Sequence, residues 1–305
     1  MVFGFLRYGF VKYILRKKEV IQRVLMFKMA LGLDQKGLSR ELMVYGVHES
    51  METQLIQEVL RPGMHALDVG GNIGYYALLE ASIVGRHGRV LVLEPAPKNF
   101  ERLKRNIALN RLSDRIVAFN FAAGDADGYE KMYLGILDNM HCLMKYPNDH
   151  RYRGSIVVET VKLDHFLAGR RKIDFLRMDL EGYECQVLEG MKEIIERDRP
   201  SLLIEMHPTG DIDPDPRYTP SIEYLIQMGY QARSVICSAK ERSMKTFRAL
   251  GYSPSVMAFH GFIKYVRYDH VHSRDIIHVA ARRPKIARAI YFSTEKKSRI
   301  SALSG

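Results

Sequence analysis

The stretch of residues 68–74 reads DVGGNIG and combines glycines with two short polar side chains at a predicted turn from strand to helix. Glycine leaves room for a bound molecule to approach the backbone, and the first turn of a helix offers unpaired N–H groups. The aspartate ahead of the first glycine adds an anion, which suits the ammonium or sulfonium group of a cofactor. The residues expected to hold this part of the cofactor are Asp68, Gly70, Gly71, Asn72 and Gly74.

Two further carboxylates follow the next two predicted strands. Glu94 lies twenty residues after Gly74, and a carboxylate at that place can accept hydrogen bonds from the hydroxyls of a ribose. Asp125 follows the third strand and could hold an adenine amine. The pattern D-x-G-x-N-x-G differs from the G-x-G-x-x-G of dinucleotide sites, in which a pyrophosphate rests on the helix N-terminus. We therefore predict S-adenosylmethionine as the cofactor.

The fourth and fifth predicted strands end in DLEGYE, from residue 179, and in EMHP, from residue 205. A hydroxyl that accepts a methyl group must lose a proton, and an imidazole titrates near neutral pH, so His207 is the expected general base. Asp179 or Glu181 would orient it or bind the acceptor. The alternative is structural: Asp179 caps the next helix and His207 satisfies a buried backbone group. Carboxylates with a histidine could also hold a divalent cation, but the spacing is not diagnostic and we predict no metal.

A polar loop at residues 138–155 interrupts the regular pattern of the chain. Loops of this length inside an α/β chain are more often functional than idle. Within the loop, Asn139 and His141 are candidates for binding the acceptor.

The elements that must position these residues alternate along the chain. The predicted strands are 65–69, 89–93, 116–122, 172–178, 201–206, 230–236 and 275–281, with shorter strand pieces at 131–134 and 156–163. The predicted helices are 73–84, 99–109, 185–197 and 221–228. Strands that alternate with helices predict βαβ units and a mostly parallel sheet. We expect an α/β, Rossmann-like fold with seven strands and helices on both faces.

The 46 Lys and Arg residues exceed the 35 Asp and Glu residues, and the excess lies at the two ends of the chain. Residues 1–50 carry nine basic and four acidic side chains, and residues 234–305 carry fourteen and four. Such ends suit anionic lipid, nucleic acid or a phosphorylated substrate, and equally a solvated face. We predict a basic helical extension at 1–50, a catalytic domain at 51–283 and a basic tail at 284–305.

The first fifteen residues are apolar but contain Arg7 and Lys12, so no run reaches the ~18–20 apolar residues that span a bilayer. Apolar side chains recur there at helical spacing, which predicts an amphipathic helix on a membrane surface or a helix packed on the protein's own core. The three cysteines, far apart, indicate neither a disulfide framework nor a metal cluster. We predict a cytoplasmic location. If the N-terminal helix lies on a membrane, we expect peripheral contact at the inner membrane surface.

Several segments occur in an order that resembles the FkbM family of S-adenosylmethionine-dependent methyltransferases. They read DVGGNIGYYALL, LVLEPAPKNFERLKRNIALN, FAAGDADG, VKLDHFL and KIDFLRMDLEGYECQVLEG. The likeness covers residues 68–207, and neither residues 1–30 nor the tail after residue 281 belongs to it. The resemblance implies a class I methyltransferase fold and O-methylation, often of a sugar or natural-product hydroxyl.

The expected function is therefore O-methylation of a hydroxyl on a glycan, a lipid-linked glycan or a natural product. A nucleic-acid methyltransferase is the enzyme alternative that the basic ends suggest. The fourth strand ends in DLEG rather than in the N/D-P-P-Y pattern typical of base-amine methylation, and no basic groove interleaved with aromatic residues is visible. The alternative from another class is a module that binds the cofactor or a membrane without catalysis.

Overall fold

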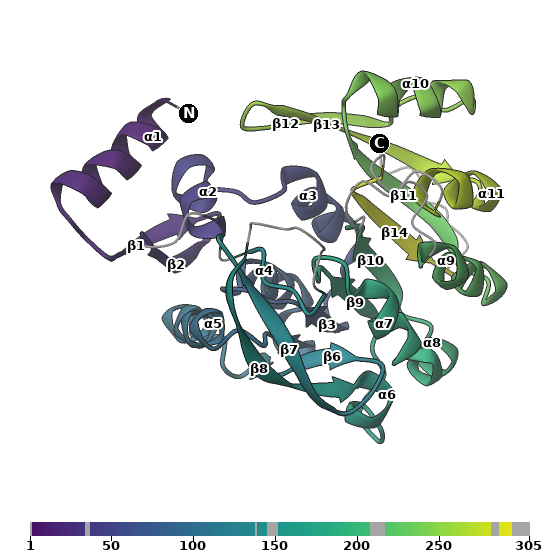
Figure 1. Ribbon diagram of the computed structural model, residues 1–305, viewed down its shortest axis with the longest axis horizontal. Coiled ribbons are helices and arrows are strands. Elements are labelled where there is room, and N and C mark those ends of the chain that lie inside the picture. Colours follow the sequence, from purple (N-terminus) through teal and green to yellow (C-terminus); the bar gives the residue numbers. More distant parts are fainter. Residues whose placement is uncertain are drawn as a thin grey trace, which may run out of the picture.

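The computed structural model describes residues 2–33, 37–137, 139–144, 152–207, 217–281 and 287–294. Its centre is a large sheet built from β3 (His65–Val69), β4 (Arg89–Leu93), β5 (Ile116–Phe119), β9 (Phe175–Met178), β10 (Ser201–Glu205), β11 (Gln231–Ser238), β12 (Val256–His260), β13 (Ile263–Val271) and β14 (Ala289–Ser293). The nine strands follow the order β12-β13-β11-β14-β10-β9-β3-β4-β5 (Figure 1). The strands from β10 to β5 pair in parallel.

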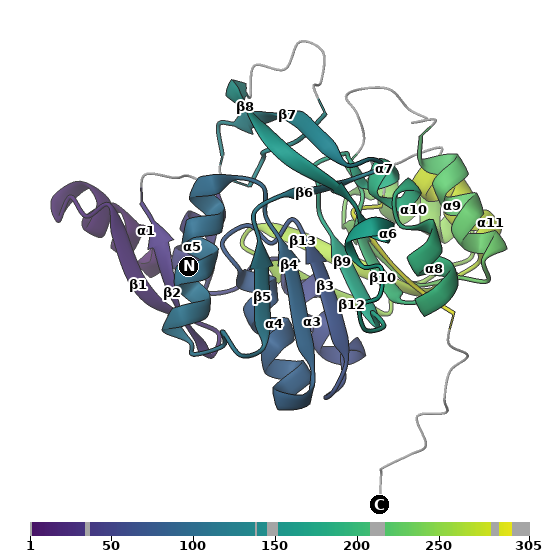
Figure 2. The ribbon, with the colours of Figure 1, turned by 90° about the horizontal axis from the view of Figure 1, so that it is seen from below.

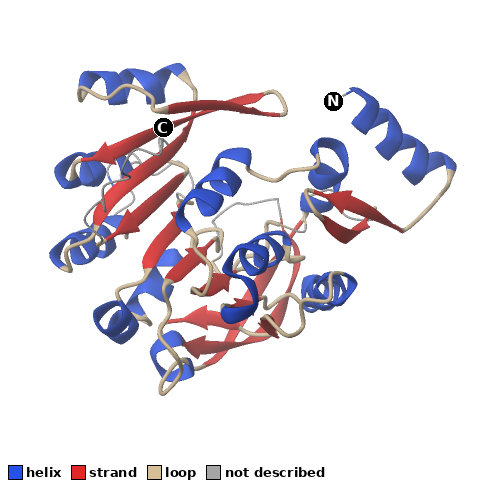
Figure 3. Cartoon of the chain, turned by 180° about the vertical axis from the view of Figure 1, so that it is seen from behind, coloured by secondary structure: helices blue, strands red, loops and turns tan. Residues whose placement is uncertain are grey.

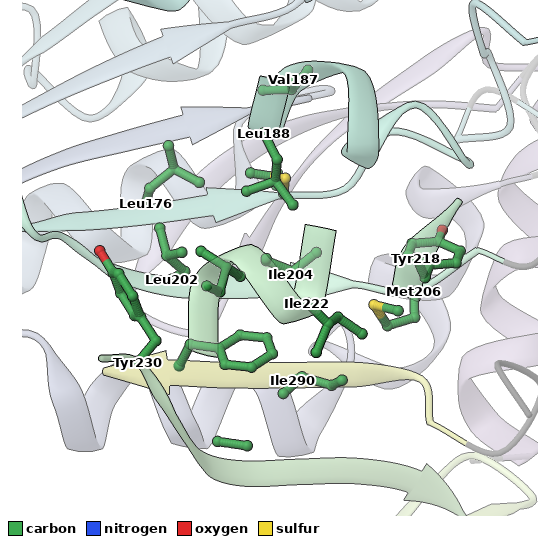
Figure 4. Packing of buried hydrophobic residues seen from close by; sticks show 14 of the residues in the cluster. Leu176, Val187, Leu188, Leu202, Ile204, Met206, Tyr218, Ile222, Tyr230 and Ile290 are labelled. Carbon is green, nitrogen blue, oxygen red and sulfur yellow. The ribbon is translucent and has the colours of Figure 1, made fainter. Parts of the chain in front are cut away.

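Helices cover both faces of this sheet (Figure 3). They are α3 (Ser50–Val59), α4 (Tyr75–Val84), α5 (Pro97–Leu109), α7 (Glu184–Glu189), α8 (Lys192–Asp198), α9 (Tyr218–Gln227) and α10 (Glu241–Ala249). Successive strand residues point to opposite faces, so Leu202 and Ile204 pack with α7, α8 and α9 (Figure 4), whereas Leu203 packs with α3, α4 and α5. The predicted α/β class with helices on both faces is confirmed.

The other half of the sheet differs from the prediction of seven strands. β14 lies between β10 and β11 and is antiparallel to both, and β12 and β13 extend the antiparallel half. β14 falls at residues that we predicted to be a tail. Its short apolar run is flanked by basic residues, which hid the strand in the sequence.

The strand predicted at residues 275–281 is wrong. These residues form α11 (Ser273–Ile276) and the π-helix η3 (Ile277–Ala281). Ile276 and Val279 are both fully buried, and their spacing of three residues fits one face of a helix rather than a strand. The helix predicted at 185–197 is two helices, separated at Gly190, where a Cβ would lie 2.0 Å from the carbonyl oxygen of Gly124.

The N-terminal residues form more than the predicted helix. That helix is confirmed as α1 (Val2–Gly9), which continues into the π-helix η1 (Phe10–Ile14). The elements that follow are β1 (Glu19–Val24), β2 (Phe27–Gly32) and α2 (Leu38–Tyr45). β1 and β2 form an antiparallel hairpin that we did not predict. The side chain of Asn106 on α5 accepts a 2.7 Å hydrogen bond from the backbone N–H of Ala30, so the hairpin packs onto α5.

A small sheet lies across the carboxyl ends of the parallel strands (Figure 2). It consists of β6 (Ala122–Gly124), β7 (Gly128–Gly135) and β8 (Tyr152–Lys162), in the order β6-β8-β7. The short elements α6 (Leu163–Phe166) and η2 (Gly85–His87) complete the described fold. Among the described residues, no helix is both long enough and apolar enough to cross a bilayer.

Candidate active site

A cavity of about 290 Å³ lies at the carboxyl ends of the parallel strands, where open α/β sheets bind their ligands. Nine of the twelve predicted site residues line it. They are Gly70, Gly71, Asn72, Glu94, Asn139, His141, Asp179, Glu181 and His207. These residues come from five separate segments of the chain. Their position around one cavity agrees with the prediction that successive strand ends face one crevice. Their individual roles stay predictions.

The glycine loop is shaped mainly by the protein's own packing. The N–H groups of Gly70 and Gly71 both donate to the carbonyl oxygen of Leu93, each at 2.9 Å. Gly70 has a φ of +88°, and a Cβ on it would lie 2.2 Å from the carbonyl oxygen of Asp179. Only glycine can therefore pass between β4 and β9 at this point.

Glu94 is almost completely buried at the end of β4. One carboxylate oxygen accepts a hydrogen bond from the N–H of Asn72 and the other from the N–H of Ala96, both at 2.8 Å. Burial raises the pKa of Glu94 to about 7. In these contacts each carboxylate oxygen accepts one backbone hydrogen bond. Its second lone pair could accept a hydrogen bond from a ligand hydroxyl.

Three predicted cofactor residues do not line the cavity. Asp68 is fully buried and accepts a 3.1 Å hydrogen bond from Arg177, and it does not line the cavity. Gly74 precedes α4, and its backbone faces Leu103. Asp125 is exposed just beyond β6. These three residues therefore lie outside the lining of the cavity, and their roles in binding the cofactor stay predictions.

Sequence reasoning missed Arg177, which lines the cavity from the middle of β9. Its guanidinium carbon lies 3.9 Å from the centre of the Tyr76 ring. It donates to Asp68 at 3.1 Å and to Asp179 at 2.9 Å. The signal was present, because Arg177 interrupts an otherwise apolar strand and stands directly opposite Asp68 on β3. Asp68 therefore acts on the site through Arg177.

His207 is surrounded by carboxylates at the end of β10. Its Nδ1 lies 2.9 Å from an oxygen of Glu184. Its Nε2 lies 3.5 Å from Glu205, 3.7 Å from Asp179 and 3.9 Å from Glu181. Burial by itself would lower the pKa of His207, but the carboxylates, Glu181 and Glu205 foremost, raise it well above its usual value. A raised pKa favours the imidazolium form at neutral pH, and an imidazolium cannot take up the acceptor's proton. This direction disfavours His207 as the general base, and its role stays a prediction.

Two of the carboxylates around His207 titrate near neutral pH instead. Burial raises the pKa of Asp179 to about 6 and that of Glu181 to about 7. Asp179 is tied to Arg177 by a hydrogen bond. Asp179, Glu205 and His207 also offer ligand atoms that all lie within 4.8 Å of one another. This set could hold a divalent cation, but only after His207 has lost a proton.

The far wall of the cavity comes from the two ends of the chain. Arg288, just before β14, pairs with Glu52 at 3.2 Å, with Glu205 at 3.1 Å and with Glu49. Arg288, Glu49 and His48 all line the cavity. We expected these positions to belong to an extension and a tail, so none of the three was among the predicted site residues.

The two predicted acceptor residues lie in the loop that follows β7. Nδ1 of His141 accepts a 3.1 Å hydrogen bond from the N–H of Gly135, and burial lowers the pKa of His141. This ring is therefore neutral and holds the loop backbone. Oδ1 of Asn139 is buried and has no hydrogen-bond partner among the described residues, so it could accept a hydrogen bond from a ligand.

Comparisons with known proteins identify the family of this chain. The family model of the methyltransferase FkbM domain matches residues 68–232. The 2-O-methyltransferase NoeI of Sinorhizobium fredii is 28% identical over 163 residues, which are 48% of this chain and 65% of NoeI. A protein-L-isoaspartate O-methyltransferase of Triticum aestivum is 33% identical over 91 residues, 27% of this chain and 40% of that protein.

A crystal structure of methyltransferase FkbM from Methylobacillus flagellatus aligns with a TM-score of 0.35 and 19% identity, covering 55% of this chain and 43% of the other. The chain thus spans less than two thirds of the length of each of these relatives. The family model nevertheless covers more than half of the chain, including the glycine loop and the ends of β4 and β9. The chain therefore belongs to the FkbM family of S-adenosylmethionine-dependent methyltransferases.

Proposed function

We propose that this protein transfers a methyl group from S-adenosylmethionine to a hydroxyl of a glycan, a lipid-linked glycan or a natural product. The observation that carries the proposal is one cavity containing Glu94 and, beyond the glycine loop, the near-neutral carboxyls of Asp179 and Glu181. The name of NoeI, a 2-O-methyltransferase, supports an oxygen acceptor.

The lining of the cavity fits the parts of the cofactor. Phe121, Ala122, Ala123 and Met132 give an apolar wall that suits an adenine ring. Glu94 suits the ribose hydroxyls, as a buried carboxylate with lone pairs to spare. The carboxylates beyond the glycine loop suit the cationic end of the molecule, and Asp68 supports them through Arg177.

When bound, S-adenosylmethionine supplies a methyl group that is transferred to the acceptor oxygen as its bond to sulfur breaks. Glu181 takes up the proton that the acceptor hydroxyl loses, on a carboxylate oxygen, and releases it to solvent after transfer. A base with a pKa near the working pH is the most effective one, and the pKa of Glu181 is about 7. Asp179 is less suited to this role because it holds Arg177.

His207 acts in this proposal as a positioning residue. Its imidazolium stands between Glu184 on one side and Glu205 on the other. Its positive charge lowers the pKa values of Asp179 and Glu181 against the rise that burial causes. His207 therefore keeps the base ionised enough to accept a proton near neutral pH.

The charges in the cavity disfavour a nucleic-acid acceptor. Glu49, Asp179, Glu181 and Glu205 line it, and Arg177 and Arg288 are already paired with carboxylates. A phosphate backbone needs free cationic groups. A neutral hydroxyl meets no such electrostatic barrier.

The test is transfer of labelled methyl from S-adenosylmethionine to a panel of glycans, lipid-linked glycans and hydroxylated natural products. We expect a labelled product that resists mild base, as a methyl ether does. Release of the label as methanol in base would identify a carboxyl acceptor and contradict the proposal. Cofactor binding without turnover on any member of the panel would favour the non-catalytic module.

A further inference from the structure

A second cavity, of about 380 Å³, adjoins the one described above. Four residues line both, namely His48, Glu49, Asn139 and Arg288. The outer walls of the second cavity come from α1, α2 and the turn between β12 and β13, through Phe5, Tyr45, Phe262 and Ile263. The two cavities therefore adjoin at these four residues.

The rim of this second cavity joins two segments that are far apart in the sequence. The ring of Phe5 on α1 lies 6.0 Å from that of Tyr45, and Tyr45 lies 5.2 Å from the ring of His260 at the end of β12. His260 is anchored in turn to Glu41 of α2, at 2.5 Å. Figure 1 shows α1 and the β12–β13 hairpin on the same side of the molecule.

Both segments also expose large apolar side chains to solvent. α1 packs on α2 through Gly4, and Tyr8 is buried, so one face of the helix is packed on the protein, whereas contact of the other face with a membrane stays a prediction. On the open face Leu6 is 64% exposed and Ile14 68%. At the hairpin, Phe259 is 68% exposed, and Phe262, in the two-residue turn, is 76% exposed. Exposed aromatic and aliphatic side chains on two segments that Tyr45 joins are typical of an interaction surface.

The charge around this surface points to one partner. Residues 1–18 contain five basic side chains and no acidic one, and Lys264 lies beside the ring of Phe259. A helix with exposed apolar residues and flanking Lys and Arg suits the interface of a bilayer with anionic headgroups. Each basic residue near such a surface strengthens binding about five-fold.

We propose that α1 and the β12–β13 turn form one docking surface for an anionic bilayer, and that the second cavity admits a lipid-anchored acceptor from that bilayer. The proposal rests on the function proposed above and selects the lipid-linked glycan among its acceptors. The acceptor's lipid stays in the membrane while its hydroxyl passes between Phe5 and Phe262 toward Arg288 and Glu181.

The test is flotation of the full chain with phosphatidylcholine vesicles, alone or with about 30% phosphatidylserine. The hairpin variant carries Phe259→Ser and Phe262→Ser. The matched control carries Tyr129→Ser and Val157→Ser, whose side chains are equally exposed, at 76% and 68%, on β7 and β8. Those strands lie away from the β12–β13 hairpin in Figure 1.

We expect the wild type and the control to float with the anionic vesicles and to bind neutral vesicles weakly. The hairpin variant should lose about ten-fold or more of its vesicle binding, and Leu6→Ser with Ile14→Ser should do the same. Equal binding to both kinds of vesicle, or equal binding by the hairpin variant and the control, would overturn the proposal. None of the substituted side chains lines the cofactor cavity, so S-adenosylmethionine should raise the Tm of every variant. This measurement separates a loss of vesicle binding from a failure of the proposed function.

Discussion

The replacement Glu181→Gln tests the identity of the base. It keeps the size of the side chain and removes its ability to accept a proton. General bases contribute on the order of 100-fold or more to turnover, so kcat should fall about 100-fold, equivalent to about 2.7 kcal/mol of activation free energy. The affinity for S-adenosylmethionine should stay nearly unchanged, because Glu94 and the glycine loop remain in place.

The pH dependence gives the sharper readout. The base must be deprotonated to act, and burial raises the pKa of Glu181 to about 7. In the wild type kcat should therefore rise with pH and level off above pH 7, with about one-tenth of the maximum one pH unit below the pKa. Glu181→Gln should abolish this rise.

The assay is steady-state transfer of labelled methyl between about pH 5.5 and 9, a window that spans the titration of the base. Glu196→Gln is the matched control, because it makes the same change at an exposed position of α8. Glu181 would not be the base if kcat and its pH dependence were the same in Glu181→Gln as in Glu196→Gln.

Three further predictions concern the neighbours of Glu181. Replacing His207 with Gln removes the charge that lowers the pKa of Glu181, so the rise of kcat should move to higher pH; an unmoved profile with lower kcat would contradict the positioning role. Gly70→Ala should lower the free energy of unfolding, measured in urea, by about 2 kcal/mol or more, because the new Cβ would meet the carbonyl oxygen of Asp179. Gly63 has the same φ of +88° but no neighbour within reach of a Cβ, so Gly63→Ala should lower it by about half as much. Equal losses in the two variants would show that the contact with Asp179 is unimportant. The sequence predicts no metal in this site, so EDTA should leave turnover unchanged, and a loss restored by a divalent cation would establish that Asp179, Glu205 and His207 hold a metal.

Much of the cofactor half of the site could be predicted from the sequence because backbone topology determines it. Parallel strands bring Gly70, Glu94 and Asp179 to one edge of the sheet whatever their side chains do. The direction of a side chain is a different matter. Asp68 faces Arg177 across the sheet, which single-strand patterns do not reveal.

The protonation of His207 could not be predicted because it depends on four carboxylates that only the fold gathers. The contribution of the chain ends was hidden for a similar reason. Arg288 and β14 lie among basic residues without helical or strand periodicity. Their position in the fold comes from the pairing of β14 with β10 and β11.

The most direct test of the central claim is thermal unfolding with S-adenosylmethionine, S-adenosylhomocysteine, NAD or no ligand, on the wild type and on Glu94→Ala. A ligand at 100 times its dissociation constant stabilises the fold by about 2.7 kcal/mol, a shift of about 5 °C in Tm. The account predicts this shift for the two sulfur nucleotides only, and its loss in Glu94→Ala. A shift with NAD, or none with S-adenosylmethionine, would contradict it.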